Sequence, residues 1–161
     1  MKYFDCHADT LTQVIKEGES LGKNTCDIDL QRIEKFADTY TQIFAIWKNR
    51  KEILPGTESS VFRKSYEKAI ELLQKAENKI RLCTSAKEME DAHQNGKAAA
   101  FLSVEDVSIM GKDIERIREL GFLFVLLSWN YENEYACGAA ADQAKGLTAR
   151  GKEMVKVLTD Q

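Results

Sequence analysis

The sequence predicts an α/β fold built on a parallel sheet of about four strands, with helices on both faces. Two segments, residues 98–104 and 122–129, are almost continuously apolar, which is typical of strands buried on both sides. Between the expected strands, apolar residues recur every three or four positions, as they do along one face of a helix. The 161 residues suffice for a single domain, residues 1–161, with a sizeable core.

The four expected strands differ in their signals. Residues 2–8 form a short segment that ends in polar residues, and residues 39–47 are rich in aromatic and β-branched side chains. Residues 98–104 are apolar except for Ser103, and residues 122–129 form the fourth strand. Residues 80–84 have an extended pattern but are too short to count among the strong strands.

Helix signals separate these strands. The helix after the first strand ends at Gly18, and Ser85 with Glu88 forms a capping box at the start of another helix. Either Ser59 or Ser60 could cap the longest helix. We expect helices at residues 10–18, 30–37, 59–79, 85–96 and 114–120, and a last helix from residue 147 to the end of the chain.

Composition and charge exclude several classes of protein. The formal net charge of −3 gives no electrostatic footprint for nucleic acid or for an anionic membrane, so neither partner is expected. The longest apolar run, residues 122–127, is far shorter than the roughly 20 residues that span a bilayer. The start has no secretory apolar region, and the four scattered cysteines form no C-x-x-C pair. These features predict a protein of the reducing cytoplasm.

Polar side chains follow the first and third expected strands. His7 and Asp9 are two residues apart, so an extended chain points both side chains to one face, where they could form half of a divalent metal site. Glu105 should lie at the same edge, because the chemistry of parallel α/β folds gathers at the carboxyl ends of the strands. The alternatives are that Asp9 caps the next helix, that His7 fills a polar pocket and that Glu105 is a solvated loop acid.

The fourth expected strand leads into a polar and aromatic loop. Trp129, Asn130 and Tyr131 stand at its start, and loops at this edge often line substrate pockets. Trp129 could equally serve only to close the mouth of a barrel. His93 lies near the end of an expected helix and is interpreted as a surface residue. The sequence has no glycine-rich phosphate loop.

An ordered set of segments resembles the membrane dipeptidase (renal dipeptidase) family of zinc peptidases. Residues 5–9, Asp-Cys-His-Ala-Asp, are similar to the family's opening D-G-H-x-D motif. Residues 27–45 resemble its D-L-x-R-x-x-x-G-x-x-x-Q-F segment, and residues 97–105 resemble its G-K-I-A strand that ends in I-E-G. Residues 119–130 and 146–148 match its L-G to L-T-[HW]-N and G-L-T stretches in the same order. The resemblance covers nearly the whole chain.

The resemblance implies a (β/α)8 barrel with a two-metal site that hydrolyses dipeptides. By resemblance, His7 and Asp9 ligate one zinc ion and Glu105 bridges two metals. Cys6 and Asp106 stand where the family usually has glycine. Trp129 stands where many members have a histidine that binds the substrate.

The length of the chain limits what it can contain. A (β/α)8 barrel needs about 250 residues, so the expected fold is the N-terminal half of such a barrel. The family's two further histidine ligands and its catalytic acid lie on later strands, beyond Gln161. The catalytic residues of this chain therefore stay unassigned.

Two functions compete on these grounds. One is a zinc-dependent dipeptidase with one or two divalent ions, of which this chain is a half that is weakly active or inactive alone. The other is a non-catalytic metal-binding or assembly domain derived from such a half. A deaminase or phosphotriesterase type of barrel is disfavoured, because those have H-x-H at the first strand. The open edges of strands 2–8 and 122–129 predict a homo-oligomer or pairing with a missing C-terminal half.

Overall fold

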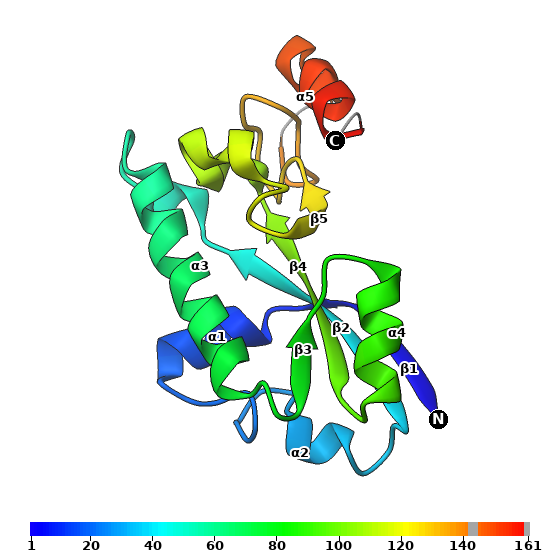
Figure 1. Ribbon diagram of the computed structural model, residues 1–161. Coiled ribbons are helices and arrows are strands. Elements are labelled where there is room, and N and C mark those ends of the chain that lie inside the picture. Colours follow the sequence, from blue (N-terminus) through cyan, green and yellow to red (C-terminus); the bar gives the residue numbers. More distant parts are fainter. Residues whose placement is uncertain (142–144, 160–161) are drawn as a thin grey trace.

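The computed structural model describes residues 1–141 and 145–159, in which strands and helices alternate along most of the chain (Figure 1). The strands are β1 (Lys2–Ala8), β2 (Thr39–Trp47), β3 (Ile80–Leu82), β4 (Ala98–Glu105) and β5 (Phe122–Leu126). The α-helices are α1 (Thr10–Glu17), α2 (Leu30–Ile33), α3 (Glu58–Lys75), α4 (Ala86–Gln94) and α5 (Ala149–Thr159). Two 3₁₀ helices are η1 (Arg50–Glu52) and η2 (Val107–Arg116).

All the strand pairs in the described residues are parallel, and β4 lies at the centre of the sheet. β2 pairs with one edge of β4 and carries β1 on its own far edge. The other edge of β4 is shared, because β3 pairs with its first half and β5 with its second half. This arrangement confirms the predicted parallel α/β fold. It adds β3 as a fifth strand, whose three residues are too few to give a strong sequence signal.

The two central strands are mostly apolar because they pack on both faces. On one face, Phe44 and Leu102 belong to the main core, together with side chains of α1 and α3. On the other face, Ile43 and Phe101 pack with Ala92 of α4 in a smaller cluster. Figure 1 shows α1 and α3 on one side of the sheet and α4 on the other. Successive strand residues therefore serve opposite layers.

The segment before β5 differs from the helix expected at residues 114–120. η2 begins earlier and is broken at Gly111, whose φ of 56° lies in the left-handed region. A Cβ atom at Gly111 would lie 2.8 Å from Ser59 Oγ, so glycine is what allows this close approach to α3. The N-cap residue of α3 is Thr57, so neither Ser59 nor Ser60 caps the helix as expected. The Ser59 hydroxyl instead donates to the Met110 carbonyl and accepts from the Lys112 N–H.

The other boundaries lie within a few residues of expectation. β5 ends at Leu126, three residues before the expected strand end at Trp129, and α2 is a single turn rather than residues 30–37. Ser85 caps α4 as expected, by accepting from the Glu88 N–H. Among the described helices, none is both long enough and apolar enough to cross a membrane.

Two strands that pair on one side only, β1 and β5, expose apolar side chains. β1 pairs only with β2, and β5 pairs only with β4. Phe4 of β1 is 49% exposed, and Leu123 and Phe124 of β5 are each 39% exposed. The expectation that the fourth strand is buried on both faces is therefore wrong, because the described residues leave side chains uncovered on both faces of β5. The apolar sequence of β5 is typical of a strand in the interior of a sheet.

We propose that the β5 edge associates with a second copy of this chain, since an unpaired apolar edge is poorly tolerated in water. Light scattering during size-exclusion chromatography at tens of micromolar should show a dimer or a larger species. Leu123→Lys should shift the population toward the monomer, whereas Leu54→Lys should not. Leu54 is the matched control because it is 72% exposed but lies outside the sheet. A purely monomeric wild-type protein would contradict the proposal.

Candidate metal centre

The structure brings His7, Asp9 and Glu105 together at the carboxyl ends of β1 and β4. The His7 Nε2 atom lies 3.7 Å from Asp9 Oδ2 and 3.5 Å from Glu105 Oε2. One possible ligand atom from each residue lies within 4.8 Å of the other two. One nitrogen and two carboxylate oxygens at this spacing are a donor set that suits zinc and other divalent metals.

An irregularity in β1 sets the direction of the His7 side chain. Asp5 pairs with Gln42 and Ala8 with Phe44, so three steps along β1 correspond to two along β2. Such a bulge bends the strand and redirects a side chain, and His7 lies within it. The His7 N–H donates to Asp5 Oδ1 at 3.0 Å, which ties the bulge to its own first residue. The simple alternation expected for an extended H-x-D segment is therefore modified locally.

Asp9 occupies the capping position of α1 without acting as a side-chain cap. It is the N-cap residue, but its carboxylate accepts no capping hydrogen bond from the helix. Its carboxylate faces His7 instead. The alternative that Asp9 serves to cap the helix therefore holds for its backbone position and not for its side chain.

Glu105 is the least exposed member of the cluster, with a side chain that is 13% exposed. Burial raises the pKa of its carboxyl group above the usual range, and the nearby Asp9 and Asp106 raise it further, while His7 acts in the opposite direction. In the described residues, no Lys or Arg forms an ion pair with Asp9 or Glu105. Two carboxylates that have no Lys or Arg partner and share one histidine form a site at which a bound cation would relieve unfavourable charge.

An aromatic contact with the end of β2 places the predicted substrate loop beside this cluster. The ring of Trp129 lies 5.0 Å from that of Trp47, and the ring of Tyr131 lies 6.0 Å from that of Trp129. Trp47 ends β2 and is the register partner of Glu105 on β4. Lys51 places its Nζ atom 3.5 Å from the centre of the Tyr131 ring. The side chains of Trp129 and Tyr131 thus form a wall near the cluster, while Asn130 accepts a hydrogen bond through its backbone carbonyl.

The sequence reasoning missed Trp47 as a residue of this wall. Its indole N–H is buried and has no hydrogen-bond partner in the described residues. The signal that could have found it is its position, since Trp47 is the last residue of a strand whose neighbours supply the predicted ligands. Lys51 gives no comparable signal, because its place depends on the fold of η1 and of a loop about 80 residues further on.

His93 does not face water as a surface residue, so that interpretation is wrong. Its side chain is partly buried, and Nε2 lies 3.0 Å from Thr41 Oγ1 and 3.1 Å from the Tyr40 carbonyl oxygen. These contacts join α4 to the first half of β2, away from the strand ends that hold the cluster. Since the sequence has two histidines, His7 is the one histidine in the cluster.

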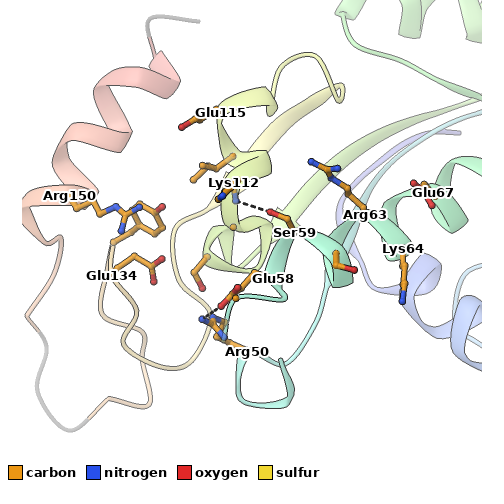
Figure 2. A pocket seen from close by; sticks show the side chains of 16 residues that line it. Arg50, Glu58, Ser59, Arg63, Lys64, Glu67, Lys112, Glu115, Glu134 and Arg150 are labelled. Carbon is orange, nitrogen blue, oxygen red and sulfur yellow. Dashed lines mark hydrogen bonds and ion pairs between the residues drawn. The ribbon is translucent and has the colours of Figure 1, made fainter. Parts of the chain in front are cut away.

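A separate cavity of about 840 Å³ lies between α3, η2 and the start of α5. Figure 2 shows its charged lining, in which Arg50 contacts Glu58 and Ser59 contacts Lys112. None of the predicted ligand or substrate residues lines it. The cavity is therefore not the predicted metal centre.

The parallel sheet, with the candidate ligands at the carboxyl ends of its strands, has the arrangement of part of a (β/α)8-type fold. A model of the membrane dipeptidase family (peptidase family M19) matches residues 1–160. The chain belongs to the membrane dipeptidase family. A comparison with curated proteins gives no match.

Solved structures of dipeptidases share the fold. The structure of a metallopeptidase described as dipeptidase AC matches with a TM-score of 0.81 and 19% identity, over 98% of this chain and 53% of that one. The probable dipeptidase PvdM from Pseudomonas aeruginosa matches with a TM-score of 0.79 and 18% identity, over 99% and 44%. A metallopeptidase from Rhodobacter sphaeroides, bound to a phosphinate mimic of the dipeptide L-Ala-D-Ala, gives 0.77 and 17%, over 99% and 56%. This chain spans about half the length of the structures it matches.

We expect the purified protein to bind a divalent metal, with zinc as the preferred ion. Metal analysis and calorimetric titration should show that His7→Ala and Glu105→Gln abolish binding, whereas His93→Asn keeps it. Affinity should fall as the pH is lowered, because metal binding needs a neutral imidazole and ionised carboxylates, and the raised pKa of the Glu105 carboxyl lets it take up a proton at a higher pH than an ordinary glutamate. Equal metal content in wild type and His7→Ala would contradict the assignment.

Glu105 should lower the stability of the metal-free protein at neutral pH. Its pKa is higher in the folded chain than in the unfolded chain, so the cost of its charge is absent below the unfolded value of about 4.3 and grows as pH rises through the folded value. Glu105→Gln should therefore raise the urea midpoint at pH 7 in the presence of a chelator, and the gain should vanish near pH 4. The exposed Glu115→Gln, which removes the same charge, is the control. A midpoint at pH 7 no higher than that of wild type would refute this.

Proposed function

We propose that this chain forms the first-metal half of a dipeptidase active site that uses zinc. The observation that carries the proposal is the cluster of His7, Asp9 and Glu105 at the carboxyl ends of parallel strands. Membership of the membrane dipeptidase family and the likeness to solved dipeptidases support it. The substrate proposed for the complete site is a small dipeptide.

Each residue of the cluster has a defined task in such a site. Neutral His7 offers Nε2 as a ligand, and the carboxylates of Asp9 and Glu105 supply negative charge that balances a cation. The chemistry that zinc supplies in a hydrolase of this kind is polarisation of the scissile carbonyl and activation of water. Trp47 and Trp129 form an apolar wall that would exclude bulk water from one side of the substrate.

The chain supplies only part of a two-metal centre. His93 is held by β2 and cannot reach the cluster without dismantling that contact, so no second histidine is available there. The same holds for a second copy of the chain, which brings the same residues again. We therefore propose that hydrolysis by this chain alone is weak or absent.

A non-catalytic metal-binding or assembly domain is the second candidate. The single histidine of the cluster and the exposed apolar edge strands favour it. A domain of this kind needs the metal ligands and the sheet edges. It does not need the aromatic side chains to bind a substrate. Binding of a dipeptide analogue therefore separates the two candidates.

The decisive experiment is calorimetric titration with a phosphinate mimic of L-Ala-D-Ala, the compound bound in the Rhodobacter sphaeroides structure. We expect binding that requires zinc and is lost in His7→Ala and Glu105→Gln but retained in His93→Asn. A panel of L,L- and L,D-dipeptides with added zinc should show hydrolysis close to the blank. Zinc binding without mimic binding would favour the non-catalytic domain. Robust hydrolysis that Glu105→Gln abolishes would show that the chain completes its own site.

The compartment proposed for the protein is the cytoplasm. Cys6, Cys26 and Cys83 are thiols in the structure, with Cys6 exposed. An exposed thiol next to a metal-binding histidine is compatible with a reducing environment, where it stays unoxidised.

A further inference from the structure

Asp106 adopts a backbone conformation that side chains rarely take. Its φ of 50° and ψ of 111° make it the one non-glycine residue with positive φ among the described residues. The residue is 5% exposed and directly follows Glu105. Glycine would adopt this conformation without strain, whereas a residue with a Cβ atom is strained in it. An aspartate that persists at such a position must be held by contacts that outweigh the strain.

The carboxylate of Asp106 is the source of those contacts. Its Oδ1 atom accepts hydrogen bonds from the Ser108 N–H at 3.0 Å and the Ser108 hydroxyl at 2.7 Å. It also accepts one from the side-chain amide of Asn133 at 2.6 Å. Hydrogen bonds to a buried carboxylate are stronger than those between neutral groups. The bond to Asn133 joins the end of β4 to a loop 27 residues further along the chain.

Asn133 organises that loop from its centre. Its amide also donates to the Leu127 carbonyl at 2.7 Å, at the start of the loop. Its side-chain oxygen accepts from the backbone N–H groups of Tyr135 and Ala136 at 2.8 and 2.9 Å. All the hydrogen-bonding capacity of the side chain thus goes to residues 127–136 and to Asp106.

The loop folded in this way carries the aromatic wall. A Cβ atom on Gly138 would lie 2.3 Å from the Trp129 carbonyl oxygen, so the chain returns tightly against the residue that meets Trp47. The backbone of Asp106 continues from Glu105, and its side chain fixes the loop of Trp129. One residue therefore connects the ligand side of the cluster to its aromatic side.

We propose that Asp106 is a positioning residue, which through Asn133 holds the loop of residues 127–136 so that Trp129 faces the metal centre and contacts the substrate. The effect on substrate binding rests on the proposed function. The effect on the position of Trp129 does not, because it follows from the hydrogen bonds alone.

The test compares Asp106→Gly, Asp106→Asn and the control Asp113→Asn. Asp113 is also a buried carboxylate with several hydrogen bonds, but it joins η2 to Arg63 of α3. Asp106→Gly removes the anchor and relieves the backbone strain, so it should fold, and Asp106→Asn keeps an oxygen that can accept from Asn133. The readouts are near-ultraviolet circular dichroism, zinc affinity and affinity for the phosphinate mimic of L-Ala-D-Ala. Circular dichroism reports on the loop because the chain has two tryptophans, Trp47 and Trp129, which contact each other.

Asp106→Gly should reduce the tryptophan signal and leave zinc affinity unchanged within about twofold. It should weaken mimic binding about tenfold, a loss that corresponds to one anchoring hydrogen bond. Asp106→Asn should restore most of both, and Asp113→Asn should leave both unchanged. A tryptophan signal in Asp106→Gly equal to that of wild type, or mimic affinity lost in proportion to zinc affinity, would overturn the proposal. If wild type binds zinc but no mimic, the proposed function fails, and the tryptophan signal alone then decides whether Asp106 anchors the loop.

Discussion

The parallel register between β2 and β4 is the constraint on which the rest of the structure depends. Seven consecutive pairs, from Thr41 with Ala99 to Trp47 with Glu105, fix these strands side by side. This register sets Glu105 at the same level as Trp47, and β1 on the far edge of β2 brings His7 to the same end. The site is therefore a consequence of strand alignment, because residues from segments almost 100 positions apart meet only if every strand ends at one edge.

The charged cluster at that edge lowers the free energy of unfolding, to which the sheet contributes. Burial and the neighbouring carboxylates Asp9 and Asp106 disfavour the charged form of Glu105, and the pKa of its carboxyl rises accordingly. The core beneath it, with Val104 and Val107 completely buried on either side of the strand end, holds the backbone in place regardless. A rigid apolar scaffold thus keeps an unfavourable group of charges assembled, as is expected of a site whose charge is balanced only when a cation binds.

The sequence predicts features that depend on local pattern better than it predicts contacts between distant segments. The ends of parallel strands are readable from local pattern, and so His7, Asp9 and Glu105 can be selected as candidate ligands from the sequence alone. Contacts between distant segments leave no local signal: Ser59 has the sequence pattern of a helix cap, although its hydroxyl binds the turn at Gly111. His93 is misinterpreted for the same reason, since its partners lie on β2, some 50 residues earlier. Likewise, an apolar run cannot distinguish a strand that is buried in this chain, such as β4, from one that is left at an edge, such as β5.

Because β5 lies at an edge of the sheet, the hydrogen bonds of the Asp106 side chain matter for the loop that follows β5. The proposed ligands lie at the ends of β1 and β4, and β2 joins these two strands by pairing with both, with the main core against β2 and β4. β5 is short, pairs with only four residues of β4 and exposes most of its side chains. The loop that follows it therefore cannot take its position from apolar packing of its own strand. The loop packs on the main core through Tyr135, and the buried carboxylate at the end of β4 adds a second attachment, because hydrogen bonds from Asn133 fix direction as well as distance. Asp106 therefore gives an aromatic loop on an edge strand a polar attachment point directly after Glu105.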